Sequence, residues 1–97
     1  MNSNNLLSNI SLCRKAGKVT TGFDAVCDNF PKAALVFALS DVSPKTLKEL
    51  RFKAEKAHRE VRLLPLTMDE AADVFGKRTG VFSVDDKGLA KIFVDIT

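Results

Sequence analysis

The sequence predicts an α/β protein, a three-layer α/β/α sandwich in which helices cover both faces of a four-stranded mixed sheet. Helical and strand-like hydrophobic patterns alternate along the chain in the order α-β-α-β-α-β-α-β-α, which is typical of this class. The run Leu35–Leu39 is apolar at every position, as in strands covered on both faces. A chain of 97 residues without an evident linker or repeat predicts a single domain over residues 1–97.

An amphipathic helix is expected at the start of the chain. Ser3 or Asn4 can cap it, and Arg14 and Lys15 fall in its last turn, where cations interact favourably with the helix dipole. Gly17 suits the left-handed position that follows many helices. The buried stripe of this helix, at helical spacing, consists of Leu6, Leu7, Ile10, Cys13 and Ala16.

The next three expected elements are short. Val19–Thr21 favours a strand because two of its residues are threonine and the third is valine. Gly22 breaks this strand, and residues 23–29 can form a short helix that Pro31 ends. The apolar run Leu35–Leu39 then predicts a strand in the middle of the sheet.

Capping signals define the helices of the second half. Ser43 followed by Pro44 predicts a helix start, and this helix extends to about Ala57 or His58. Its inner stripe consists of Leu47, Leu50, Ala54 and Ala57. Val61–Leu64 is the expected strand after it.

The remaining elements complete the alternation. A capping-box sequence opens a helix over 67–75, which Gly76 ends. Residues 80–84 predict the fourth strand, and Asp85–Gly88 predicts the turn that leads into a last helix over residues 89–95.

Positive charge is concentrated in two segments, although the net charge of the whole chain is only +3. Residues 1–18 contain three cations and no acid, and residues 45–62 contain seven cations and three acids. This asymmetry predicts a basic face that suits a polyanionic partner. A solvated helix with ordinary charge pairs explains the second segment equally well.

No catalytic constellation is evident. His58 is the only histidine, and Cys13 and Cys27 form no CxxC pair, so we expect the cysteines to be small core residues rather than metal ligands or nucleophiles. Asp85 and Asp86 fit a helix-start turn better than a metal site. We therefore expect no enzyme, no cofactor and no metal. No apolar run approaches the length of a membrane span, and the polar N-terminus lacks the features of a signal peptide, so we expect a cytoplasmic protein without membrane contact.

Two loop regions are candidates for binding. Lys18 and the segment Thr21–Asp24 bracket the first strand, and Gly22 permits close approach of a ligand to the backbone. The second region, 76–80, has Lys77 and Arg78 between glycines. A plain helix cap, strand and turn is the alternative explanation of the first region. For the second region, taken as a motif alone, an ordinary surface loop is favoured over a binding site. The chain has no Trp or Tyr, which argues against an open aromatic platform for stacking RNA bases.

Four runs of the sequence carry a resemblance to a known family: Leu12–Gly22, Lys32–Pro44, Phe75–Val81 and Val84–Ala90. Together they resemble the kink-turn-binding ribosomal proteins, the ribosomal L-seven-Ae / L-thirty-e family, and in particular its bacterial YlxQ-like branch. The resemblance implies an α/β/α sandwich and a non-catalytic protein that binds ribosomal or other structured RNA. Its implied partners are a kink-turn-like or ribosomal RNA and, further, ribosomal proteins, and we expect a monomer.

The family carries an Asn-Glu-x-x-Lys motif at the start of its second helix, and this chain departs from it. The matching positions here are Asp24, Ala25 and Asp28. Asp24 can accept a hydrogen bond but lacks the donors of an amide. Asp28 places a negative charge where the family has a cation, which repels phosphate.

The resemblance implies three groups of RNA contacts. Backbone groups of Thr21, Gly22, Phe23 and Asp24 would approach the RNA, with Lys18, Gly22 and Lys32 at one end of the site. The loop that packs on RNA would contain Lys77, Arg78 and Thr79, with Thr79 beside extruded bases. The expected phosphate contacts are Lys18, Lys32, Lys77 and Arg78.

Two alternatives remain open. The same fold can serve as a protein-interaction module in which RNA binding is lost or weakened. It can also serve as a substrate-recognition domain for an RNA methyltransferase whose catalytic domain is a separate chain.

Overall fold

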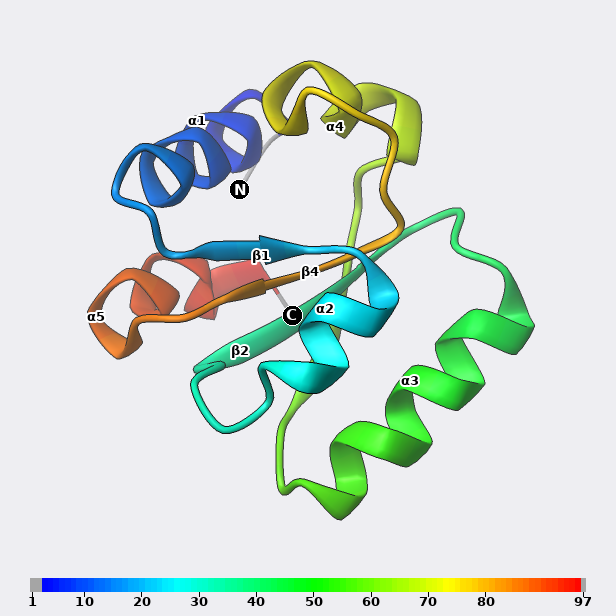
Figure 1. The fold of residues 1–97 in the computed structure, drawn as a ribbon. Coiled ribbons are helices and arrows are strands. Elements are labelled where there is room, and N and C mark those ends of the chain that lie inside the picture. Colours follow the sequence, from blue (N-terminus) through cyan, green and yellow to red (C-terminus); the bar gives the residue numbers. More distant parts are fainter. Residues whose placement is uncertain (1–2, 97) are drawn as a thin grey trace.

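The elements alternate along the chain in the predicted order (Figure 1). The computed structural model describes residues 3–96 and the side chains of residues 5–93. The elements are α1 (Ser3–Lys15), β1 (Val19–Thr21), α2 (Phe23–Asp28), β2 (Leu35–Leu39), α3 (Pro44–Lys56), β3 (Val61–Leu64), α4 (Met68–Phe75), β4 (Val81–Val84), α5 (Lys87–Ala90) and a 3₁₀ helix (Lys91–Ile96). Within the described residues, no helix is both long and apolar enough to cross a membrane.

The sheet is mixed, and its strand order is β1-β4-β2-β3. β2 and β3 are parallel, with Leu39 opposite Leu64, whereas β4 runs antiparallel to both β1 and β2. The last strand in the sequence therefore lies between the first two. This insertion decides which loops meet at each end of the sheet.

Two separate cores confirm the three layers. Leu35, Phe37 and Leu39 of β2 face a cluster formed with α1, α4 and α5, while Val36 and Ala38 face a cluster formed with α2 and α3. Figure 1 shows these two groups of helices on opposite faces of the sheet. The alternation follows from the period of two along a strand, and it explains why every residue of β2 is apolar.

The predicted caps are present. The Ser43 side chain accepts from the backbone N–H of Thr46 at the start of α3, and Thr67 and Glu70 form the reciprocal capping box of α4. Gly76 ends α4 with φ 72°, in the left-handed region. The side chains of Ser3 and Asn4, which are the expected caps of α1, lie outside the described ones.

The C-terminal helix differs from the prediction of 89–95. The α-helix covers Lys87–Ala90, and Lys91–Ile96 form a 3₁₀ helix. The Asp86 side chain accepts from the backbone N–H of Leu89 and so starts the helix two residues earlier than predicted. The interpretation of Asp85–Gly88 as a helix-start turn is confirmed in part, because Asp86 is the cap.

Candidate nucleic-acid interface

The turn between β1 and α2 lies directly beside the loop that precedes β4. The backbone N–H of Gly22 donates to the Val81 carbonyl at 2.9 Å, and Thr21 pairs with Phe82 across the sheet. Gly22 has φ 96° and ψ 146°, a conformation that side-chain-bearing residues rarely adopt. Residues 21–24 and 76–80, which the sequence predicted as separate loops, therefore form one surface.

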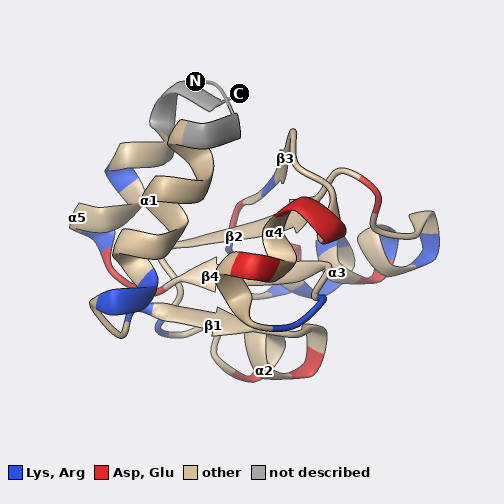
Figure 2. Ribbon diagram, turned by 90° about the horizontal axis from the view of Figure 1, so that it is seen from above, with Lys and Arg blue, Asp and Glu red and all other residues tan. Residues whose placement is uncertain are grey.

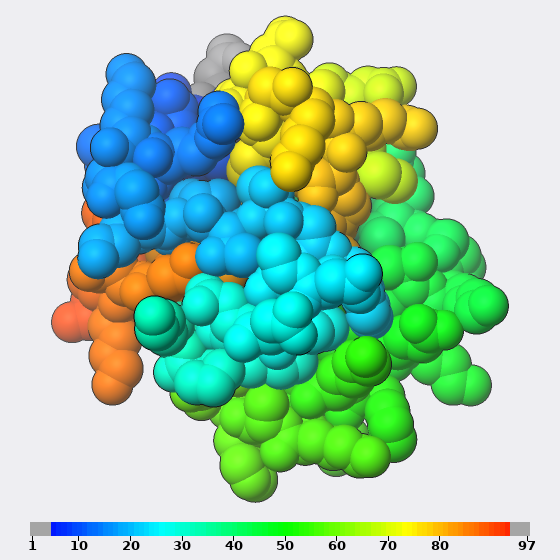
Figure 3. Space-filling view, viewed as in Figure 1, coloured from blue at the N-terminus to red at the C-terminus, as the bar shows by residue number. Residues whose placement is uncertain are grey.

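The C-terminal end of α1 adjoins the same surface. The Arg14 guanidinium donates to the Val74 carbonyl in the last turn of α4, where a cation interacts favourably with the free carbonyls of a helix end. Lys15 is exposed beside it. Figure 3 shows α1 in blue, the turn in light blue and cyan and the loop in gold on one face of the molecule. We call Arg14, Lys15 and residues 21–24 and 76–80 together the candidate interface.

Neither Arg14 nor Lys15 was among the predicted contacts. The signal that pointed to them was the charge of residues 1–18, which contain three cations and no acid. The exposed Lys77 ammonium makes no hydrogen bond or ion pair within the described part of the chain. Lys15 and Lys77 are therefore the cations of the interface that are open to a phosphate.

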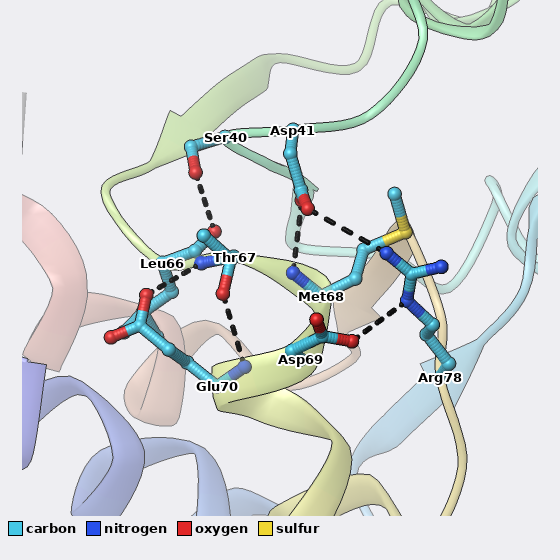
Figure 4. A network of polar contacts seen from close by, with 8 residues as sticks. All are labelled: Ser40, Asp41, Leu66, Thr67, Met68, Asp69, Glu70 and Arg78. Carbon is cyan, nitrogen blue, oxygen red and sulfur yellow. Dashed lines mark hydrogen bonds and ion pairs between the residues drawn. The ribbon is translucent and has the colours of Figure 1, made fainter.

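Arg78 is held by acids of two other segments (Figure 4). Its Nε lies 3.0 Å from an oxygen of Asp69 in α4, and its Nη2 lies 3.9 Å from Asp41 after β2. Asp41 also accepts from the backbone N–H of Met68 at 2.9 Å. Arg78 therefore tethers the loop to the start of α4, and a phosphate that binds it competes with two carboxylates.

The structure places Thr79 differently from the prediction. Its side chain is only 7% exposed, and its hydroxyl donates to the Val81 carbonyl at 3.1 Å. The hydroxyl is already used, so the expected contact between this side chain and an extruded base is wrong for the structure as it stands. The side chain faces inward at the point where the backbone enters β4.

Phe23 is half-buried, and it packs against the core cluster beneath α2 and α3. The Lys53 ammonium of α3 lies 5.5 Å from the centroid of its ring, within the range of a cation–π interaction. Phe23 therefore contributes packing and its backbone to the turn, while its ring face is shared with Lys53.

Lys18 and Lys32 do not join the other predicted contacts. Lys18 precedes β1, and its carbonyl accepts from the backbone N–H of Asp85, which follows β4. Lys32 lines a hollow together with Asp85. Because β1 and β4 are antiparallel, this is the end of the sheet opposite Gly22. The expectation that Lys18, Gly22 and Lys32 lie at one end is therefore wrong.

The helix α2, which follows the turn, carries acidic residues (Figure 2). Asp24, Ala25 and Asp28 are all exposed, so the positions that match the family motif face outward. Two negative charges adjoin a face whose cations come from α1 and from the loop. This charge pattern weakens the attraction of phosphate to α2 itself.

The thiols show no sign of activation. Cys13 is fully buried, and burial raises the pKa of its thiol, with a further contribution from the charge of Asp86. Burial likewise raises the pKa of the partly exposed Cys27. A raised pKa keeps a thiol protonated near neutral pH, the reverse of what a nucleophile requires. The prediction that Cys13 is a core residue is confirmed.

Comparison with known proteins gives similarity of structure only. No family model matches the chain, and no curated protein does. A solved protein of unknown function from Bacillus halodurans is 24% identical, with a TM-score of 0.82, and the match covers 93% of each chain. The Giardia lamblia 15.5kD RNA binding protein is 17% identical, with a TM-score of 0.77, and the match covers 97% of this chain and 86% of that one.

The chain has the fold of these two proteins. At these identities the likeness establishes the fold and leaves the binding site to be argued from the residues. The predicted α/β/α sandwich is therefore supported twice, by the described structure and by the neighbours.

Proposed function

We propose that the chain is a non-catalytic RNA-binding protein of the kink-turn-binding ribosomal family, in its YlxQ-like branch, that acts in the cytoplasm on ribosomal or other structured RNA. One observation carries the proposal. The hydrogen bond from Gly22 to Val81 brings together the turn and the loop in which the sequence resembles that family. The shared fold with an RNA-binding protein from Giardia supports it.

The interface offers both kinds of group that phosphate binding needs. No side chain caps α2, so the backbone N–H groups of its first turn are left for an acceptor outside the helix. Lys77 supplies positive charge in the adjoining loop, and Lys15 supplies it at the C-terminal end of α1. Contacts of this type position an RNA without reading its sequence, so on this proposal the RNA is selected by its shape.

Absence of catalysis is part of the proposal. The raised pKa values of both cysteines support it, because neither thiol is prepared to attack a substrate. The only exposed acid among the described residues of the candidate interface is Asp24. It makes no hydrogen bond or ion pair with the cations of the interface, so no pair of groups there is arranged for acid–base catalysis.

The test is a titration of the protein against a kink-turn RNA and a straight duplex of equal length, across a series of salt concentrations. We expect tighter binding to the kinked RNA. Lys77→Ala should weaken binding and reduce the slope of log K against log salt by about 0.7 to 0.9, the loss of one phosphate contact. Lys48→Ala is the control, because it removes an equal charge from the exposed face of α3. Equal effects of the two variants would contradict the assignment of the interface.

A protein-interaction module is the second candidate, and the exposed acids Asp24 and Asp28 favour it. They replace groups that would attract RNA with groups that repel it. On this alternative, the protein binds neither RNA even at low salt and retains a discrete protein partner after nuclease treatment. The same titration therefore separates the two candidates.

A further inference from the structure

The end of the sheet opposite Gly22 and Val81 carries two adjoining hollows. One, of about 440 Å³, lies between residues 31–34 and the start of α5. The other, of about 320 Å³, lies between the start of β3 and α5. Ala34 and Lys87 line both, so the two hollows form one extended groove around Lys87.

Cations dominate the groove. Those that line it are Lys32, Arg59, Arg62, Lys87 and Lys91, and the acids are Glu60 and Asp85. Both carboxylates already accept hydrogen bonds from other side chains of the protein. Asp85 accepts from the hydroxyls of Thr20 and Ser83, each at 2.7 Å. Glu60 accepts from Arg62 at 3.0 Å. The groove therefore has an excess of positive charge that its own acids do not cancel.

The three lysines are open to a ligand, since none of their ammonium groups makes a hydrogen bond or ion pair within the described residues. The two arginines are fixed. Arg59 donates to the carbonyls of Phe30 at 2.7 Å and Pro31 at 3.3 Å, which orients its guanidinium without neutralising it. Arg62 is held by Glu60, and its Nη1 is buried without an acceptor. This unpaired donor belongs to a side chain that lines one of the two hollows.

We propose that this groove binds the backbone phosphates of RNA, as a second surface used together with the candidate interface. The inference rests on the proposed function. The groove is extended, and its unpaired lysines lie among arginines that the protein holds in place. This arrangement suits a row of phosphates better than a single small anion. No aromatic side chain lines either hollow, so bases have nothing to stack on. Lys18 lies at the same end of the sheet, because its carbonyl bonds to Asp85.

The experiment compares two RNAs that share one kink-turn. The short RNA has minimal stems. The long RNA has stems longer than the protein, whose extents are 32 × 27 × 24 Å. Lys87→Gln with Lys91→Gln should weaken binding of the long RNA and lower its salt slope by about 1.4 to 1.8, the loss of two phosphate contacts. Binding of the short RNA should not change.

Lys45→Gln with Lys48→Gln on α3 is the control, because it removes the same charge from outside both surfaces. Thermal unfolding checks that each variant folds. If the groove variant binds the long RNA with unchanged affinity and unchanged salt slope, the groove does not bind RNA phosphates. A preference of the protein for kinked RNA would still support the proposed function in that case. If wild type shows no such preference, yet the groove variant alone loses affinity for the long RNA, the groove stands and the kink-turn part of the proposed function fails.

The source of the phosphate is tested by backbone amide shifts of Lys87 and Lys91. We expect saturable shifts with the long RNA and none with the short one. Saturable shifts with AMP or inorganic phosphate, but none with the long RNA, would overturn the proposal and indicate a free phosphate ligand.

Discussion

Removing the carboxylate that holds Arg78 should strengthen RNA binding. Asp69 lies 3.0 Å from Arg78 Nε, and both side chains are largely exposed, at 83% and 59%. Asp69→Asn keeps the shape of the side chain and removes its charge. Arg78 then loses its nearer acid and is freer to meet a phosphate, with only Asp41 at 3.9 Å remaining.

The expected size follows from Coulomb's law. A phosphate on the outer edge of the Arg78 guanidinium would lie about 6 Å from the Asp69 carboxylate, where two unit charges in water repel by about 0.7 kcal/mol, or a factor of about three in affinity. Stability should fall slightly. An exposed ion pair contributes up to about 1 kcal/mol. An acid in the first turn of α4 contributes about 0.3 to 1 kcal/mol.

The assay is the kink-turn titration at fixed low salt, combined with urea unfolding. Asp73→Asn is the matched control, since it removes an exposed charge from the same helix without touching Arg78. We expect the gain in affinity to be larger for Asp69→Asn than for Asp73→Asn, and to shrink when Arg78→Ala is also present. Equal gains in the two single variants would refute the reasoning and mean that α4 acts only through its total charge.

Two further predictions concern the turn and the loop of the interface. Gly22→Ala should lower the free energy of unfolding, measured in urea, by about 1 to 3 kcal/mol because of backbone strain at φ 96°. Nothing lies within 4 Å of the added Cβ, so strain is the expected cause rather than a clash. A change near zero would show that the turn relaxes to another conformation. Thr79→Val should leave RNA affinity unchanged and lower the free energy of unfolding by about 0.5 to 1.5 kcal/mol, since the lost hydroxyl bonds only to Val81. A clear loss of affinity at unchanged stability would show that the Thr79 hydroxyl contacts the RNA.

The sequence was sufficient for the helices and strands whose ends carry chemical signals. Ser43 before Pro44 and the capping box at 67–70 define α3 and α4 because a side-chain oxygen must satisfy the free N–H groups of a helix start. The same reasoning predicted the wrong start for the last helix. There, two successive aspartates were available, and the second of them, Asp86, is the cap.

The neighbours of a strand were not predictable in the same way. A period of two tells which side chains share a face, but it does not tell which strands are adjacent. Placing β4 between β1 and β2 moved Lys18 to the end near Asp85 and Gly22 to the end near Val81. Arg78 shows a related limit, because its carboxylate partners lie on segments that only the fold brings together.

The two basic surfaces together give a physical reason for selecting an RNA by shape. Phosphate contacts do not depend on sequence, so a single basic surface binds straight and bent RNA alike. The turn and loop of the candidate interface, residues 21–24 and 76–80, lie at the end of the sheet opposite the groove, in a molecule up to 32 Å long. A straight duplex bound at one of these surfaces cannot contact the other, whereas a kinked RNA can change direction and contact both. On the proposals made above, the acids of α2 then help discrimination, because they weaken binding to one surface alone and favour RNAs that reach the second.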